Sequence, residues 1–164
     1  MKLKPLVFAA ATAASFSAYA TTVDWGLHDP LEVAAAVTAV GAFDDSYLFS
    51  LLGENNAFST AVSNNLTGVL GIAGGMVTLY METGAVDTAV GAFAFNDTTG
   101  SISYSFGTLA GGDYYYAVTG LGTGTLGGFY TLSSTVSAVP EMETTALLLA
   151  GLGVVGLLAR RRQR

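Results

Sequence analysis

The chain has 164 residues, a formal net charge of −6 and no cysteine, which excludes disulfides, thiolate metal sites and thiol nucleophiles. All of its basic residues lie in two terminal segments, and the segment between them, residues 21–139, carries ten acidic residues and no Lys or Arg. Nucleic-acid binding depends on Lys and Arg to neutralise phosphates, so we expect no nucleic-acid partner.

The first 20 residues have the layout of a secretory signal peptide. Lys2 and Lys4 precede an apolar stretch, and Ala18 and Ala20 form the small-x-small pattern at which signal peptidase cleaves. A short N-terminal helix of the fold is the alternative explanation. We expect signal peptidase to be a partner and to cleave after Ala20.

The single histidine, His28, lies near the expected mature N-terminus. Only this residue could serve as the base of a hydrolytic triad, which also needs a nucleophile and an acid gathered around it. A solvated or structural histidine is the more common role at such a position. We therefore expect no catalytic residue, no cofactor and no enzymatic activity, and keep an envelope hydrolase as a third hypothesis.

The central segment has the composition of an all-β domain, with short runs of Val, Thr, Tyr and Phe separated by Gly, Asn and Asp. Residues 31–40 could begin a helix. Strands are predicted at residues 47–52, 57–62, 76–82, 90–95, 101–106, 114–119 and 129–136. This spacing predicts an antiparallel, jelly-roll-like β-sandwich over residues 21–138, and a barrel fits the same pattern.

Two segments of this domain have the composition of turns. Residues 96–100 predict the turn of a hairpin between the flanking strands. Residues 120–128 are glycine-rich, but without a lysine or a following helix they indicate a flexible β-loop rather than a phosphate-binding loop.

Asp44, Asp45 and Asp97 are oxygen donors of the type that calcium prefers. None of them lies in an EF-hand pattern, and turn-forming Asp residues are the simpler explanation. We expect no metal site, with these three residues as the weak candidates.

Three consecutive tyrosines suggest a further hypothesis. Strand alternation places Tyr114 and Tyr116 on one face and Tyr115 on the other. Aromatic faces can stack on sugars, which would make the domain a carbohydrate-binding module. Filling of the core is the alternative, and we favour it.

The C-terminal segment, residues 139–164, contains 14 uncharged residues at 146–159 followed by an arginine cluster at 160–164. A helix over 146–159 would be about 21 Å long, which is shorter than a bilayer core and is also compatible with a buried core helix. Its terminal position and Arg160, Arg161 and Arg162, which would stay on the cytoplasmic side, favour a short inner-membrane anchor.

The order Val139-Pro140-Glu141, apolar helix, Arg160-Arg161-Arg162 resembles the PEP-CTERM sorting signal of exopolysaccharide-producing Gram-negative bacteria. Met142 stands where that family most often has a second proline. The resemblance implies recognition by an exosortase, a membrane-embedded cysteine protease, with processing near Pro-Glu and delivery to the cell surface or extracellular matrix.

Phe43, Asp45 and Tyr47 are similar to the Phe-x-Asp-x-Phe signature of one PEP-CTERM subfamily. A later Gly- and Tyr-rich segment at residues 109–130 is also usual in such proteins. We expect Phe43 and Tyr47 to be buried and Asp45 to cap a turn.

Together these features predict an exported, non-enzymatic protein of the cell surface or biofilm matrix. It would be anchored transiently in the inner membrane through its C-terminal segment. The alternative is a carbohydrate-binding module for exopolysaccharide, with or without calcium.

Overall fold

The computed structural model describes residues 20–84, 86–97, 103–139 and 142–162. Of the expected signal peptide, Ala20 alone belongs to these ranges, and Ala18 lies outside them. The described residues form nine strands and one helix: β1 (Thr22–Leu27), β2 (Leu31–Thr38), β3 (Gly41–Leu51), β4 (Asn55–Ser63), β5 (Ile72–Met81), β6 (Thr88–Phe95), β7 (Tyr104–Leu109), β8 (Gly112–Gly122), β9 (Gly128–Ala138) and α1 (Met142–Arg162).

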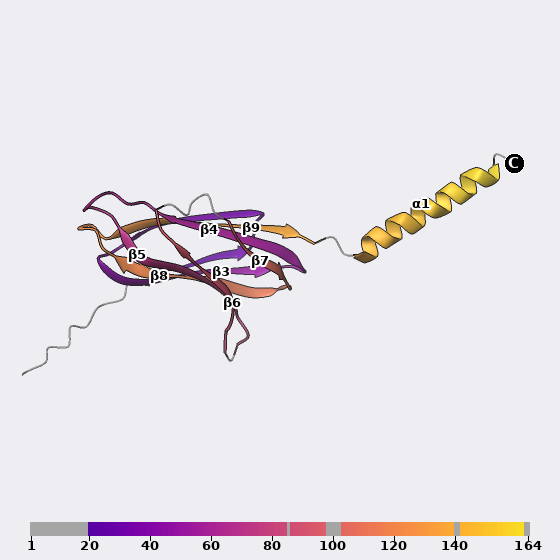
Figure 1. The fold of residues 1–164 in the computed structure, drawn as a ribbon. Coiled ribbons are helices and arrows are strands. Elements are labelled where there is room, and N and C mark those ends of the chain that lie inside the picture. The colour runs from indigo at the N-terminus through magenta and orange to yellow at the C-terminus, as the bar shows by residue number, and fades with distance from the viewer. Residues whose placement is uncertain (1–19, 85, 98–102, 140–141, 163–164) are drawn as a thin grey trace, which may run out of the picture.

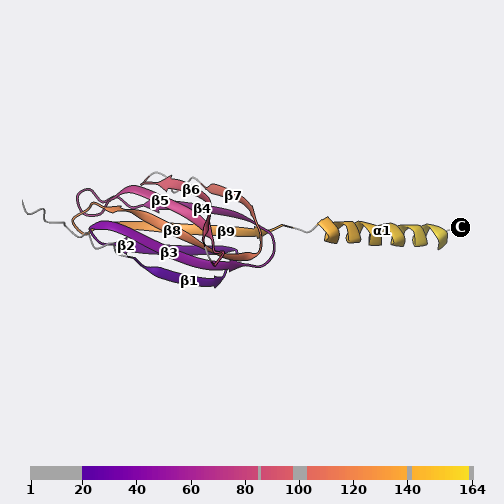
Figure 2. The ribbon, with the colours of Figure 1, turned by 90° about the horizontal axis from the view of Figure 1, so that it is seen from below.

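The strands form two sheets packed face to face (Figure 1, Figure 2). The five-stranded sheet has the order β1-β3-β8-β5-β6, and the four-stranded sheet has the order β2-β9-β4-β7. Neighbouring strands are antiparallel except β1 and β3, which are parallel. From β2 to β9 the chain changes sheet at every connection except β5 to β6, which is the alternation of a jelly-roll sandwich. The fold is therefore an all-β sandwich, as the sequence predicted.

The core lies between the two sheets and follows from side-chain alternation along the strands. On β3, Phe43, Tyr47 and Phe49 are buried, while the alternate residues 44, 46 and 48 point to the outer face. The opposite sheet contributes Tyr130 and Leu132 from β9, both without exposed surface. Aromatic side chains supply much of the buried area, which stabilises the sandwich by about 25 cal/mol per Å² of apolar surface.

The possible helix start at residues 31–40 does not occur, because Leu31–Thr38 forms strand β2. This strand pairs with β9 along all eight residues. Its small side chains Ala34 and Ala36 pack on the core, whereas Val33 and Val37 are exposed. The period of two shows that pairing with β9 overrides the helical propensity of the alanines.

The expected hairpin around residues 96–100 is also wrong. Strand β6 is an edge of the five-stranded sheet, and β7 is an edge of the four-stranded sheet. The Phe93 ring stacks on that of Tyr104, with 5.3 Å between centroids, and contacts Phe106 as well. These rings cover one side of the sandwich, between two edge strands that belong to different sheets.

The glycine-rich segment after β8 is a compact turn rather than an open linker. Gly124 N donates to Gly127 O, and Thr123 N donates to Gly71 O, at 3.0 and 2.9 Å. A Cβ atom at Gly127 would lie 1.9 Å from Thr38 O, so the backbone of β2 occupies the space that any side chain would need. Glycine is required here for close approach of three chain segments.

The C-terminal segment forms α1, which includes residues 146–159. Its described side chains at 146–155 are all exposed, and both views draw α1 apart from the sandwich (Figure 1, Figure 2). The alternative of a core helix therefore does not hold for these residues. Among the described residues, no helix has both the length and the apolarity that crossing a membrane would require.

Candidate functional site

The outer face of the five-stranded sheet carries a stacked aromatic pair. The rings of Tyr80 on β5 and Tyr115 on β8 lie 5.1 Å apart at 15°, and both side chains are half-buried. The Tyr115 hydroxyl donates to Asp87 Oδ2 at 3.0 Å. Desolvation and this hydrogen bond raise the pKa of Tyr115 to about 12, so its hydroxyl is neutral at physiological pH.

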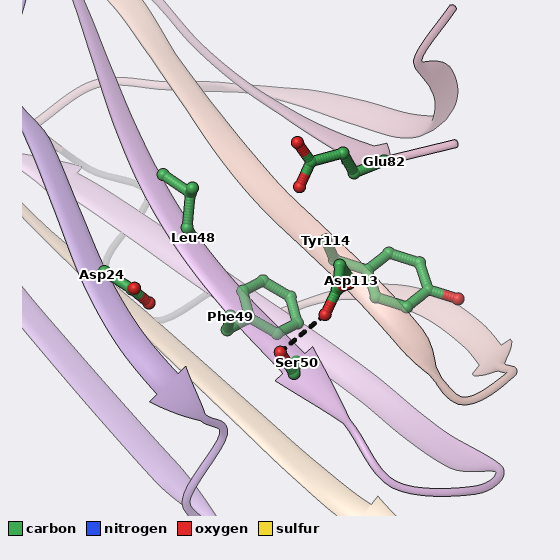
Figure 3. Close-up of a pocket in the computed structure, with 7 residues that line it drawn as sticks. All are labelled: Asp24, Leu48, Phe49, Ser50, Glu82, Asp113 and Tyr114. Carbon is green, nitrogen blue, oxygen red and sulfur yellow. Dashed lines mark hydrogen bonds between the residues drawn. The ribbon is translucent and has the colours of Figure 1, made fainter. Parts of the chain in front are cut away.

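A pocket of about 190 Å³ opens on the same sheet near the ends of β1, β3 and β8 (Figure 3). Asp24, Glu82 and Asp113 contribute carboxylates to its lining, and Figure 3 shows them reaching it from three segments. Ser50 Oγ donates to Asp113 Oδ1 at 2.7 Å. Because residues 21–139 contain no Lys or Arg, no basic side chain of the domain neutralises this pocket.

A second hollow of about 280 Å³ lies beside the first and shares Leu48 and Glu82 with it. Tyr115 forms part of its lining, so the stacked pair and the two hollows are continuous. We call this surface the outer acidic face and define it by Asp24, Leu48, Tyr80, Glu82, Asp113 and Tyr115. It combines an aromatic platform with carboxylate acceptors, a combination that can bind hydroxyl-rich ligands.

The sequence indicated one residue of this face. Alternation alone placed Tyr115 opposite Tyr114 and Tyr116, and the structure buries the latter two in the core. Tyr80 and Glu82 could not be assigned to the face, because their proximity to Tyr115 depends on the pairing of β5 with β8. Asp113 is one of the ten acidic residues of 21–139, and the sequence alone does not indicate where in the fold it lies.

The three signature residues lie side by side along the inner face of β3. Phe43, Asp45 and Tyr47 are 3%, 4% and 2% exposed. The expectation that Asp45 caps a turn is wrong, because Asp45 lies within the strand, paired with Val118 of β8. Its carboxylate points into the core, where it needs hydrogen-bond donors.

Two donors supply the Asp45 carboxylate. The Tyr130 hydroxyl donates to Oδ2 at 2.7 Å, and the Thr21 backbone N donates to Oδ1 at 2.8 Å. Since the Tyr130 proton goes to Asp45, the Tyr47 hydroxyl at 2.7 Å must donate to the Tyr130 oxygen. Burial raises the pKa of Tyr130 and of Tyr47, which keeps both phenols protonated and donating.

His28 belongs to a second buried network. Its Nδ1 bonds the Asp29 carbonyl oxygen, so Nδ1 carries the proton and Nε2 accepts from Ser134 Oγ at 2.8 Å. Ser134 in turn accepts from the Tyr116 hydroxyl at 2.9 Å. Burial lowers the pKa of His28 and raises that of Tyr116 to about 12.

His28 and Ser134 place a base and a hydroxyl within hydrogen-bond distance, but both residues are buried. Ser134 has no exposed surface, and His28 is 8% exposed beneath Trp25. A carbonyl rather than a carboxylate orients the imidazole. The hydrogen bonds hold the β1–β2 connection against β9. A substrate could not reach the buried Ser134 hydroxyl.

The weak metal candidates are not brought together. Asp44 points to the outer face of β3, and Asp45 points into the core. Asp97 follows β6, three strands away and therefore about 14 Å distant. Among the described residues, no three His, Cys, Asp or Glu side chains form a group able to hold a metal ion.

The expected sorting motif begins where the sandwich ends. Val139 N donates to Glu54 O at 3.0 Å, and Pro140 and Glu141 lie outside the described residues. Arg160 and Arg161 are exposed in the last turn of α1, and Arg162 is its final residue.

Three of the solved structures that resemble the chain are a collagenase domain and two lysozyme inhibitors. The pre-peptidase C-terminal domain of a Bacillus anthracis collagenase is 19% identical with a TM-score of 0.46, covering 72% of this chain and 96% of that one. PliG of Salmonella Typhimurium, a periplasmic inhibitor of g-type lysozyme, is 12% identical with a TM-score of 0.40, covering 74% and 100%. PliG of Aeromonas hydrophila is 17% identical with the same TM-score and coverage.

At these identities and TM-scores the neighbours carry no functional argument. No family model matches the chain. No curated protein matches it either.

Proposed function

We propose that the protein is an exported, non-enzymatic component of the cell surface or biofilm matrix, delivered through its C-terminal segment. The observation that carries this proposal is the ordered set of Val139-Pro140-Glu141, an apolar run and an arginine cluster. The set begins at Val139, whose backbone N still donates a hydrogen bond to Glu54 O of the sandwich. A protease acting after that residue would release the whole β-domain without cutting any strand.

The route uses both chain ends. Signal peptidase removes residues 1–20, and the apolar run holds the protein transiently at the inner membrane with Arg160, Arg161 and Arg162 on the cytoplasmic side. An exosortase-type protease then processes the chain at Pro140-Glu141. The exposure of the α1 side chains at 146–155 supports this route, since a segment that does not pack on the sandwich is free for recognition elsewhere.

The non-enzymatic role is supported by the state of the one histidine. His28 is buried and hydrogen-bonded on both ring nitrogens, and its partner Ser134 is inaccessible. The outer acidic face has carboxylates and phenols but no histidine, lysine or arginine to pair with them.

The test is delivery in the native host. A variant with Pro140→Ala and Glu141→Ala is expected to accumulate at unprocessed mass in the inner-membrane fraction, while the wild type reaches the surface or matrix. Glu143→Ala is the matched control, because it removes a nearby carboxylate outside the motif and should be delivered normally. Equal delivery of the double variant and the control would refute the proposal.

A second candidate function is binding of exopolysaccharide at the outer acidic face. The observation that favours it is the half-buried Tyr80–Tyr115 pair beside two hollows. Sugar rings can stack on such a platform while carboxylates such as Glu82 and Asp113 accept hydrogen bonds from their hydroxyls.

Glycan binding would be measured on the whole secreted chain with purified host exopolysaccharide, with and without a calcium chelator. Tyr80→Ala and Tyr115→Ala should each weaken binding about fivefold, since a stacked aromatic contributes on the order of 1 kcal/mol. Tyr104→Ala, at an exposed tyrosine remote from this face, is the control. Binding that all three variants retain would discard this function.

A further inference from the structure

The first residue after the expected cleavage point touches the buried carboxylate of the signature motif. Thr21 N lies 2.8 Å from Asp45 Oδ1. Thr21 O accepts from Ser46 N at 2.8 Å, so both backbone polar groups of Thr21 are fixed against β3. The position of this nitrogen is thus determined by the start of the β1–β3 pairing, which begins at Thr22 and Ser46.

The surroundings of Asp45 lack a positive charge. Asp45 is 4% exposed, and its two hydrogen-bond donors are the Tyr130 hydroxyl and the Thr21 nitrogen. No Lys or Arg occurs in residues 21–139. A buried carboxylate with no counter-charge is costly, and removing its partners is strongly destabilising.

Cleavage of the signal peptide changes the chemistry of the Thr21 nitrogen. Water adds across the Ala20–Thr21 amide: the C–N bond breaks, a C–O bond forms on Ala20, and protons from water complete the new amine. The product is a carboxylate on the released peptide and an α-ammonium on Thr21, which is protonated at neutral pH. In the precursor, the same nitrogen is an uncharged amide.

We propose that Asp45 is the binding site for the α-ammonium of the mature N-terminus, so that export processing supplies the missing counter-charge of the core. This inference rests on the proposed cleavage after Ala20. The pairing would explain why an aspartate is buried at this position of the signature. Phe43 and Tyr47 flank it as core residues, and Asp45 binds the new N-terminus.

The ion pair would act on the most weakly attached strand of its sheet. β1 is a six-residue edge strand whose one sheet neighbour is β3, with an irregularity in the pairing after Asp24. Trp25 on β1 covers Tyr47, with 5.4 Å between ring centroids. An ion pair at Thr21 would therefore hold β1 in place, and with it the Trp25 ring that lies over Tyr47.

The sequence permits a site-specific chemical test. Lysine occurs at residues 2 and 4 alone, so the chain of residues 21–164 contains one amine, the α-amine of Thr21. This chain is compared with residues 19–164, whose α-amine is displaced by two residues and whose Thr21 nitrogen is an amide. The two chains are prepared with Thr21 and Tyr19, respectively, as their N-terminal residues. Each is then labelled with an amine-reactive succinimidyl ester at pH 8.

The Thr21 amine is expected to react at least about tenfold more slowly than the displaced amine, because pairing with a carboxylate raises the pKa of the amine and so reduces its reactive neutral form. In denaturing urea the two rates should become equal. Equal rates in the folded proteins would overturn the inference.

A second measurement uses stability, with Trp25, the one tryptophan, as the fluorescent reporter. The folding equilibrium constant of residues 21–164 should exceed that of residues 19–164 about tenfold, and Asp45→Asn should abolish this difference. An advantage that survives in the Asn background would contradict the pairing. The labelling result stands independently if Asp45→Asn fails to fold.

The intact mass of the protein from its host separates this inference from the proposed processing. A chain that begins at a residue other than 21 contradicts the proposed cleavage, whatever the labelling rates of the two prepared chains. A chain that begins at Thr21 with an amine that labels freely contradicts the pairing with Asp45 and leaves the export route intact.

Discussion

At the scale of single residues, the Tyr130 hydroxyl joins two partners in the core. Tyr130→Phe removes the donor to Asp45 and the acceptor of Tyr47, leaving a buried carboxylate short of one bond. We expect it to lower the free energy of unfolding by about 2–3 kcal/mol. Tyr47→Phe keeps the bond to Asp45 and should cost about 1 kcal/mol. Urea unfolding measures both, and equal losses would argue against this order of donors.

His28 should make stability depend on pH. Burial lowers its pKa in the folded protein, so the unfolded chain takes up a proton first as the pH falls below about 6.5. The free energy of unfolding should therefore decrease between about pH 6.5 and 5, by at most about 1.4 kcal/mol per pH unit.

The His28 effect can be isolated because the chain has no other histidine. In His28→Gln the slope of stability against pH in that interval should be nearly flat, since unpaired carboxylates titrate mainly below it. A slope unchanged by the substitution would assign the pH dependence to other groups.

At the scale of structural elements, the turn between β8 and β9 should tolerate no side chain at Gly127. Its φ is +91° and an added Cβ would meet Thr38 O, so Gly127→Ala combines a left-handed backbone with a backbone clash. Gly84 has a φ of +83° with nothing within 4 Å of an added Cβ. Gly84→Ala should cost about 1 kcal/mol, and Gly127→Ala about 3 kcal/mol or more.

Thermal unfolding of these two alanine variants measures the cost of the clash by difference. Because both sites have similar φ values, the backbone strain is matched. Equal melting temperatures would mean that β2 can shift away from the turn without loss.

Sequence patterns predicted the strands whose own residues alternate between apolar and polar side chains. Strands β3, β4 and β8 alternate between core and surface, and Phe43 and Tyr47 are buried as expected, whereas Phe58 lies on the exposed side of β4. The β2 strand was misassigned because an alanine-rich run has no local preference for its partner β9. Strand β1 was not predicted, although Val23, Trp25 and Leu27 alternate with polar or small residues, because a six-residue run is short and depends on parallel pairing with β3.

The candidate site was largely beyond sequence reasoning for the same reason. Tyr80 and Tyr115 are 35 positions apart, and their stacking requires a specific register between β5 and β8. The turn chemistry around Asn96 was compatible with a hairpin and with a crossing between sheets, so local residues could not decide between them.

At the scale of the whole molecule, the uncompensated negative charge of the domain should make stability depend on salt. Ten acidic residues without a Lys or Arg repel one another, and salt screens this repulsion. Raising NaCl from low to physiological concentration should stabilise the fold by about 1 kcal/mol, or about 4 °C in Tm.

Calcium chloride at matched ionic strength is the control. An equal shift would indicate screening alone, whereas a larger one would indicate specific binding of the divalent cation. Destabilisation by NaCl would contradict the prediction.

The positions of the two domain ends also determine how the protein would bear force. The chain enters the sandwich before β1 and leaves it after β9 at opposite ends of the long axis in both views (Figure 1, Figure 2). A pull between a tethered C-terminus and a contact near the N-terminus is directed along the strands. The hydrogen bonds of the parallel β1–β3 pair would then be sheared together rather than opened one by one, a loading geometry suited to a domain that resists flow while fixed at one end.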